Sequence, residues 1–368
     1  MEFIDLKTQY LTYQKEIDAR MKAVLDHGQF IMGPEIEEME SKLADFVGVK
    51  HCISVSSGTH SLEIALRALK IGPGDEVITV PFSWISSAEV IPLVGAKPVF
   101  VDVERDSFNM NPGLLESAIT KNTKAIMPVS LFGQMPNLEA IQAIADKHGI
   151  PVIEDAAQSF GATRNGLKSC GATLIGSTSF FPAKPLGCYG DGGALFTDDD
   201  ELATAMKAIR THGGVQRHHH TLVGTNGRFD TLQAAVILGK LPHFENEIKA
   251  RATAGDRYNE LLKAVCKVPL TVEGNTHVYA QYTLRIDSKK RDNVVEELKK
   301  ESIPVAVYYP TCFHEQPVFD YLGYQWGDFP ESEKASREVF SLPMHPFLNE
   351  EEQHLIADRL TFVLEKNS

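Results

Sequence analysis

The chain has 368 residues, of which 43% are hydrophobic and 23% are charged, a composition that argues against a disordered protein. Its 36 basic and 49 acidic side chains give a formal net charge of −13, which argues against non-specific nucleic-acid binding because such binding needs a basic surface. At roughly 150 residues per domain, the length predicts about two domains.

The sequence lacks the features of a membrane or secreted protein. It has no run of about 18 apolar residues, and its start, Met1-Glu2-Phe3-Ile4-Asp5, is acidic where a signal peptide is basic. The five cysteines are widely spaced and form no CxxC pair, which favours neither a zinc ribbon nor a disulfide framework. We therefore expect a cytoplasmic protein with no membrane partner.

Over the first two thirds of the chain, short apolar runs alternate with helical patterns. The first helical pattern, 34–47, opens with Pro34, which suits the first position of a helix. Strands are predicted at 52–55, 77–80, 98–101, 125–129 and 151–153, and helices at 61–69, 83–93, 114–119 and 138–147. This alternation predicts an α/β fold with a mostly parallel sheet between helical layers, in which ligands bind at the carboxyl ends of the strands.

The pattern changes after about residue 244. A long charged helix is predicted at 245–262 and a final helix at 350–364, and between them lie a strand at 278–286, a helix at 291–301 and a strand at 304–309. We expect a large domain over 1–244 and a smaller C-terminal α/β domain over 245–368.

A lysine between two prolines is the first candidate for chemistry. Lys184 stands in Pro182-Ala183-Lys184-Pro185, before a glycine cluster. Because proline restricts its own backbone and that of its neighbour, Lys184 is expected in a rigid, non-helical turn. A lysine in a partly apolar pocket has a lowered pKa, so its amine can form a Schiff base with a carbonyl. The alternative is a surface lysine in a proline- and glycine-rich loop.

An acidic residue follows the apolar strand predicted at 151–153. Asp155 is expected at the carboxyl end of this strand, and Gln158 lies three residues further on. A carboxylate there can hold the protonated ring nitrogen of pyridoxal phosphate, and Gln158 can reach the same ligand. The alternative for Asp155 is the N-cap of a following helix.

Two further segments provide partners for a phosphate and a flat ring. Ser57-Gly58-Thr59 joins a strand to an amphipathic helix, whose N-terminal amides and dipole suit a phosphate. Trp84 follows the next predicted strand and can stack on a planar ring. Simple helix capping and core packing are the respective alternatives.

With these residues, the sequence resembles the DegT/DnrJ/EryC1/StrS family of sugar aminotransferases, which are fold-type-I enzymes that use pyridoxal 5'-phosphate. The resemblance spans nearly the whole chain. The motifs that carry it are Gly33-Pro34-Glu35, Ser57-Gly58-Thr59, Glu154-Asp155-Ala156-Ala157-Gln158, Ser179-Phe180-Phe181-Pro182-Ala183-Lys184, Gly190-Asp191-Gly192-Gly193, Asn226-Gly227-Arg228-Phe229-Asp230 and Ser341-Leu342-Pro343-Met344-His345-Pro346.

The resemblance implies a role for each residue around the cofactor ring. Lys184 would form the Schiff base with the cofactor and then carry the proton between carbon atoms. Asp155 would pair with the ring nitrogen, Gln158 would lie near the phenolic oxygen, and Trp84 would stack on the ring.

The family also implies how the phosphate is held. Gly58, Thr59 and Ser179 would bind it from one subunit, and Asn226 would reach the phosphate of the neighbouring subunit. The resemblance therefore implies a homodimer with its active sites at the subunit interface.

Within the family, the sequence is similar to bacterial enzymes of surface-polysaccharide (O-antigen) biosynthesis that aminate the C3 ketone of UDP-2-acetamido-2-deoxy-3-oxo-D-glucuronate, with L-glutamate as the amino donor. Those enzymes read Val-His-Tyr-Pro where this chain has Val307-Tyr308-Tyr309-Pro310, so Tyr308 at the sugar site leaves the exact sugar open. Arg228 is a candidate partner for the sugar carboxylate, and Tyr309 for a hydroxyl. The alternatives are an interface ion pair for Arg228 and ordinary packing for Tyr309.

Other functions are weighed against this one. Sugar dehydratases of the same fold replace the lysine by histidine, so Lys184 argues against them. A non-catalytic, pyridoxal-phosphate-binding regulator would not need Lys184 and Asp155 together, whereas an aminotransferase for another 3-oxo or 4-oxo dTDP- or UDP-sugar remains open. No metal site is expected at His218-His219-His220, because consecutive side chains diverge, and Cys188 is expected to pack rather than react.

Overall fold

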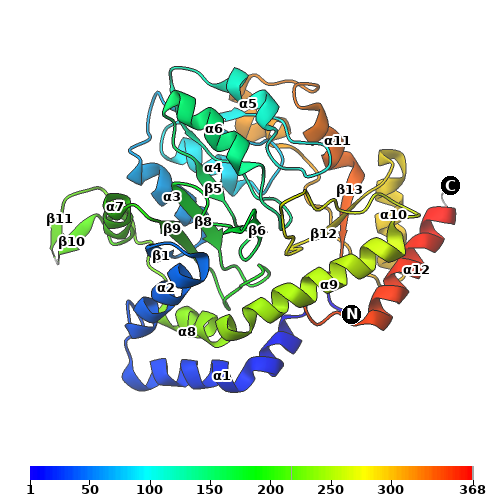
Figure 1. The fold of residues 1–368 in the computed structure, drawn as a ribbon, viewed down its shortest axis with the longest axis horizontal. Coiled ribbons are helices and arrows are strands. Elements are labelled where there is room, and N and C mark those ends of the chain that lie inside the picture. Colours follow the sequence, from blue (N-terminus) through cyan, green and yellow to red (C-terminus); the bar gives the residue numbers. More distant parts are fainter. Residues whose placement is uncertain (217, 367–368) are drawn as a thin grey trace.

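The computed structural model describes residues 1–216 and 218–366 (Figure 1). The main sheet consists of β1 (His51–Val55), β2 (Glu76–Thr79), β3 (Lys97–Phe100), β4 (Thr123–Ile126), β5 (Ile153–Asp155), β8 (Ile175–Ser179) and β9 (Gly193–Thr197). Hydrogen bonds order these strands as β1-β9-β8-β5 and β3-β2-β4. Parallel bridges Ile126–Val152 and Val129–Asp155 join the two groups, so β5 lies in the middle of the sheet.

The mostly parallel sheet predicted from the sequence is confirmed. β2 pairs in parallel with β3 and β4, and β5 pairs in parallel with β8, whereas β9 runs antiparallel to both β1 and β8. The sequence pattern did not predict β8 and β9. β8 reads Ile-Gly-Ser-Thr-Ser, which is not an apolar run, and the apolar run of β9 is limited to Ala194-Leu195-Phe196, although both strands are buried.

Helices cover both faces of this sheet. They are α1 (Leu6–His27), α2 (Pro34–Val47), α3 (Gly58–Ala68), α4 (Ser86–Leu93), α5 (Pro112–Ala118), α6 (Leu138–His148), α7 (Asp200–Arg210) and α8 (Thr231–Lys240). Alternate strand residues face opposite layers. Ile53 and Leu195 pack with α3, α4 and α7, whereas Cys52 and Phe196 pack with α2 and α8.

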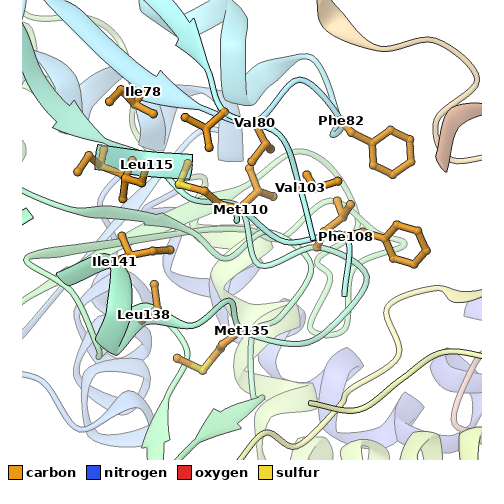
Figure 2. Packing of buried hydrophobic residues seen from close by; sticks show 14 of the residues in the cluster. Ile78, Val80, Phe82, Val103, Phe108, Met110, Leu115, Met135, Leu138 and Ile141 are labelled. Carbon is orange, nitrogen blue, oxygen red and sulfur yellow. The ribbon is translucent and has the colours of Figure 1, made fainter. Parts of the chain in front are cut away.

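A third apolar cluster lies where α5 and α6 cover β2 and β4 (Figure 2). Its labelled members are Ile78, Val80, Phe82, Val103, Phe108, Met110, Leu115, Met135, Leu138 and Ile141. All of these side chains are buried, and burying side chains of this size stabilises a fold by about 1.5–3 kcal/mol each. The cluster therefore fixes the strand ends that precede the candidate site.

Three predicted elements near these strands differ from the structure in their bounds, the first being the strand predicted at 125–129, which is Thr123–Ile126. The predicted strand 151–153 is shifted to Ile153–Asp155, so Asp155 is the last residue of β5. The helix predicted at 83–93 begins only at Ser86, because residues 81–85 form turns that carry Trp84.

The C-terminal part forms its own core around a two-stranded antiparallel sheet. Its elements are α9 (Phe244–Leu262), β12 (Tyr282–Arg285), α10 (Ser288–Lys300), β13 (Val339–Leu342) and α12 (Glu350–Lys366). The predicted helices 245–262, 291–301 and 350–364 are confirmed. Figure 1 shows α9 running from the end of α8 toward α12.

The strand predicted at 304–309 is wrong, and the one predicted at 278–286 is too long. Ala306 makes only a single bridge, to Ser341. Prolines at 304 and 310 remove backbone donors at both ends of that segment, and Tyr308 and Tyr309 line a cavity instead. Strand pairing at 278–286 is limited to Tyr282–Arg285, because residues before it dock on another loop.

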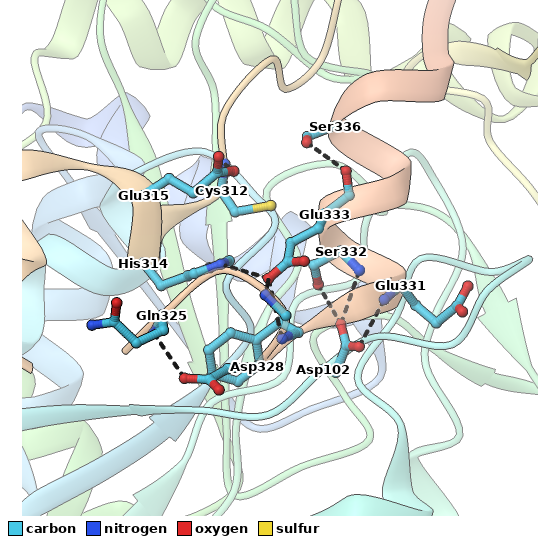
Figure 3. A network of polar contacts seen from close by, with 12 residues as sticks. Asp102, Cys312, His314, Glu315, Gln325, Asp328, Glu331, Ser332, Glu333 and Ser336 are labelled. Carbon is cyan, nitrogen blue, oxygen red and sulfur yellow. Dashed lines mark hydrogen bonds and ion pairs between the residues drawn. The ribbon is translucent and has the colours of Figure 1, made fainter. Parts of the chain in front are cut away.

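A buried polar network ties the segment after Tyr309 to the main sheet (Figure 3). Its elements are η2 (Phe313–Glu315) and α11 (Pro330–Glu338). Asp102, which follows β3, accepts hydrogen bonds from the backbone nitrogens of Glu331 and Ser332, each at 2.9 Å. His314 of η2 pairs with Glu333 of α11 at 3.0 Å. These contacts fix the segment that follows Tyr309 against the main sheet.

The remaining elements are peripheral. They are β6 (Thr163–Arg164), β7 (Leu167–Lys168), β10 (Gly214–Gln216), β11 (His219–His220), η1 (Leu241–His243) and η3 (Pro317–Leu322). β10 and β11 pair as a hairpin that projects from the body, with both histidines of β11 exposed. In residues 1–216 and 218–366, no helix is long and apolar enough to cross a bilayer, and no three metal-ligating side chains are grouped to hold an ion.

Candidate active site

A cavity of about 430 Å³ lies beyond the carboxyl ends of β2, β4, β5 and β8. This is the edge of a parallel sheet at which ligands are expected. Eight of the predicted site residues line it: Gly58, Thr59, Trp84, Asp155, Gln158, Ser179, Lys184 and Tyr309. They come from five separate segments of the chain, so the fold brings together residues that the sequence placed far apart.

Asp155 is buried at the end of β5 and is held by two donors. The Ser87 hydroxyl donates to Oδ2 at 2.6 Å, and the backbone nitrogen of Ala157 donates to Oδ1 at 3.2 Å. Burial raises the pKa of the Asp155 carboxyl, while these hydrogen bonds and Lys184 oppose the rise. Turns rather than a helix follow β5, so the helix-cap alternative is wrong.

Lys184 lies in the expected non-helical turn. Its backbone nitrogen donates to the carbonyl of Phe181 at 2.8 Å. Burial lowers the pKa of the Lys184 ammonium, and the nearby Asp155 carboxylate partly opposes this. A lowered pKa increases the fraction of neutral amine, which is the form that attacks carbonyl groups.

A residue of α8 anchors the turn that carries Lys184. Lys240, at the end of α8, is buried and donates a hydrogen bond from Nζ to the carbonyl of Gly187 at 2.7 Å. Cys188 is also buried, and burial raises the pKa of its thiol to about 11, which fits a packing role.

A cradle for a phosphate is formed where α3 meets the end of β8. Ser57 caps α3 by accepting a hydrogen bond from the backbone nitrogen of His60 at 3.0 Å. A Cβ atom at Gly58 would lie 2.6 Å from the Cβ of Ser179, so only glycine permits this approach. Thr59 is held by a 2.6 Å hydrogen bond to Ser86. The free amides at the start of α3 and these hydroxyls fit a phosphate group.

One wall of the cavity is ordered by the amide of Gln158. Its Oε1 accepts from the backbone nitrogen of Phe132 at 2.8 Å, and its Nε2 donates to the hydroxyl oxygen of Tyr309 at 2.9 Å. Burial raises the pKa of Tyr309, so its phenol stays protonated and can donate. Trp84 is 59% exposed at the cavity mouth, and its ring centroid lies 6.4 Å from that of Tyr309.

Asn226 and Arg228 do not line the cavity of their own chain. Asn226 is exposed next to Thr211, with which it forms a bridge. Arg228 is partly buried, and its Nε has no hydrogen-bond partner among the described residues. The same region exposes large apolar side chains, with Ile31 bridged to Asp230 and 50% exposed.

The cavity is also lined by residues that were given no individual site role, some of them within the quoted motifs. Ile4, Ser57, Ser83, Ser86, Ser87, Phe181, Ala183, Asp191, Gln281 and Tyr308 also line the cavity. Ser87 belongs to no motif, and Gln281, within Val278-Tyr279-Ala280-Gln281-Tyr282, was given no site role, since the positions of both side chains depend on tertiary packing. Tyr308 was noted in the sequence, because it stands where the related enzymes have histidine.

The strand order, the buried acid at the end of β5 and the lysine turn after β8 define a fold-type-I, pyridoxal-phosphate-type transferase. Residues 12–361 match the model of the DegT/DnrJ/EryC1/StrS aminotransferase family, and the chain belongs to that family. It is therefore an aminotransferase.

Three known proteins are similar over almost the whole chain. UDP-2-acetamido-2-deoxy-3-oxo-D-glucuronate aminotransferase of Pseudomonas aeruginosa is 51% identical over 362 residues, which cover 98% of this chain and 99% of that protein. The structure of S. venezuelae DesV in complex with a ketimine intermediate has a TM-score of 0.96 and 35% identity, covering 99% of this chain and 98% of that one. NtdA of Bacillus subtilis with bound cofactor PMP has a TM-score of 0.89 and 31% identity, covering 96% and 82%.

Proposed function

We propose that this aminotransferase uses pyridoxal phosphate to move an amino group from L-glutamate to the C3 ketone of UDP-2-acetamido-2-deoxy-3-oxo-D-glucuronate, in the cytoplasm. The main support for this chemistry is structural. Lys184, Asp155 and the cradle between α3 and Ser179 line one cavity. The sugar is supported by the Pseudomonas aeruginosa relative of that name.

The residues present fit the cofactor. When bound, pyridoxal phosphate supplies an electron sink for the carbon next to the transferred nitrogen. The start of α3, with Gly58 and Thr59, would hold its phosphate together with Ser179. Asp155, kept in place by Ser87 and Ala157, would hold the ring nitrogen protonated.

Lys184 would act as base and acid in turn. Its lowered pKa provides a neutral amine that can take the proton from the α-carbon of the amino donor and would return it to the carbon on the other side of the transferred nitrogen. Gln158 would orient Tyr309, whose protonated hydroxyl can donate to the sugar. Trp84 would cover one face of the ring from the cavity mouth.

We further propose a homodimer in which Asn226 and Arg228 complete the partner's site. Both lie outside the cavity of their own chain, beside exposed apolar residues that include Ile31 and, on the hairpin side, Val223, which is 84% exposed. Arg228, with an unpaired buried Nε, would meet a sugar carboxylate. We also propose the domain division 1–244 and 245–368, since α9 starts at Phe244 and its later turns enter the C-terminal core.

The function is tested by incubating the purified protein with ¹⁵N-labelled L-glutamate and the 3-oxo nucleotide sugar. We expect a ¹⁵N-amino sugar nucleotide and 2-oxoglutarate by mass spectrometry, and none with Lys184→Ala. Transfer to a 4-oxo dTDP-sugar but not to the 3-oxo uronate would replace the proposed substrate. Failure with every keto-sugar, despite bound cofactor, would contradict the function itself.

A further inference from the structure

Most polar side chains of the catalytic cavity already have partners inside the protein. The Asp155 carboxylate is bonded to Ser87, the Gln158 amide is engaged at both ends, and Thr59 is paired with Ser86. Gln281 differs from them. It lines the same cavity, and its side-chain oxygen is buried without a hydrogen-bond partner in the described part of the chain.

The position of Gln281 is built by close contacts rather than by strand pairing. Its backbone nitrogen donates to the carbonyl of Phe132 at 3.4 Å, and Phe132 donates in turn to Gln158. Next to it, Gly133 has φ +124°, and a Cβ there would lie 2.7 Å from the backbone nitrogen of Tyr279. Gln281, Gln158 and Tyr309 are therefore fixed on one wall of the cavity.

A buried acceptor without a partner is costly, and a ligand that supplies a donor removes the cost. The two substrates differ in this respect. The only hydrogen-bond donor of L-glutamate is its α-amino group, which is the group that reacts at the cofactor, and its two carboxylates only accept, whereas a nucleotide-linked acetamido sugar carries hydroxyl and amide N–H donors away from the reacting carbon. The unpaired oxygen therefore suits the sugar and not the amino donor.

We propose that Gln281 is a sugar-recognising residue whose side-chain oxygen accepts a hydrogen bond from a hydroxyl or acetamido N–H of the nucleotide sugar. This assignment rests on the proposed function for the identity of the sugar class. It makes Gln281 a determinant of the second half of the reaction, in which the amino group is delivered, whereas Lys184 and Asp155 serve both halves.

The test compares the holoenzyme with Gln281→Met, which removes the amide at nearly constant volume. Thr283→Val is the matched control, because Thr283 lies two residues further along the chain, bonds Ser341 at 2.9 Å and does not line the catalytic cavity. Two quantities are measured for each protein: the Kd of UDP-N-acetylglucosamine by calorimetry, and the concentration dependence of the spectral change with L-glutamate.

We expect Gln281→Met to raise the Kd of UDP-N-acetylglucosamine about tenfold and to change the glutamate dependence by less than about twofold. Thr283→Val should change neither. An unchanged Kd, an equal weakening toward glutamate, or an equal effect of Thr283→Val would overturn the proposal. A wild type that does not react with glutamate but loses sugar affinity with Gln281→Met would refute the proposed function and keep the assignment of Gln281.

Discussion

The hydroxyl of Ser87 donates a 2.6 Å hydrogen bond to the carboxylate of Asp155, and both groups are buried. Ser87 belongs to α4 and Asp155 to the end of β5, so the contact joins a helix to the central strand of the sheet. It opposes the rise that burial causes in the pKa of Asp155. Ser87 therefore favours the charged form of the carboxylate, which is the form that can pair with a protonated ring nitrogen.

Ser87→Ala should lower kcat/KM by about tenfold or more, since hydrogen bonds to charged groups contribute about 1.5–3 kcal/mol. Loss of the donor raises the pKa of Asp155 further, so the acidic limb of the pH–activity profile should move to higher pH. Ser130→Ala is the control, because Ser130 donates at 2.6 Å to the neighbouring Glu154. An acidic limb that stays in place in Ser87→Ala would show that Ser87 does not control Asp155.

Gly58→Ala should weaken cofactor binding. The added Cβ would lie 2.6 Å from the Cβ of Ser179 and would push the start of α3 away from the end of β8. We expect the Kd for pyridoxal phosphate, measured by absorbance titration, to rise about tenfold or more. Gly72→Ala is a matched control, because its nearest atom would be 3.8 Å away. Equal affinities in the two variants would argue against the cradle.

If Asn226 completes the active site of the partner subunit, dimers that contain two different variants should be partly active. Lys184→Ala and Asn226→Asp should each be almost inactive alone, the second because a carboxylate would face the phosphate. If Asn226 serves the partner's site, a hybrid dimer contains one site in which both residues are intact. Co-refolding the two variants should then restore about a quarter of wild-type activity. No recovery, with dimers present by sedimentation, would place Asn226 outside the partner's site.

The buried Lys240 predicts a pH dependence of stability. Burial lowers the pKa of Lys240 from 10.5 to about 8. Above about pH 8 the folded chain has released a proton that the unfolded chain still binds, so this residue adds stability as the pH rises, by up to about 1.4 kcal/mol per pH unit. Relative to Lys240→Met, the wild type should therefore gain unfolding free energy between about pH 8 and 10 in urea titrations.

The control for that experiment is Lys15→Met, which changes an exposed lysine on α1. Its stability difference from the wild type should not vary with pH. A pH-independent difference for Lys240→Met as well would mean that the Lys240 amine is not desolvated.

Local patterns in the sequence predicted what depends on local chemistry. The parallel strands, the helices of the C-terminal part and the lysine turn follow from apolar runs, helical periodicity and proline restriction, and eight of the predicted site residues line one cavity. Contacts between distant segments were not predictable in this way. Ser87 reaches Asp155 only once α4 packs on the sheet, and Gln281 reaches the cavity only because Gly133 lets two loops approach.

At 304–309, local sequence predicted a strand that the structure does not form. Its residues have strand propensity, but the prolines at 304 and 310 remove donors and the two tyrosines are used by the cavity. Here tertiary packing overrides propensity. β8 is the reverse case, since its Gly-Ser-Thr-Ser sequence has no apolar run and is nevertheless buried as a strand next to β5.

Lys184 would bind pyridoxal phosphate and move the proton as the amino group of L-glutamate passes to the cofactor. An absorption spectrum of the purified protein before and after excess L-glutamate tests this half-reaction. We expect a visible band that disappears as a near-ultraviolet band grows, and no such change in Lys184→Ala. A wild type that shows no visible band even after addition of pyridoxal phosphate, or a band that glutamate leaves unchanged, would contradict it.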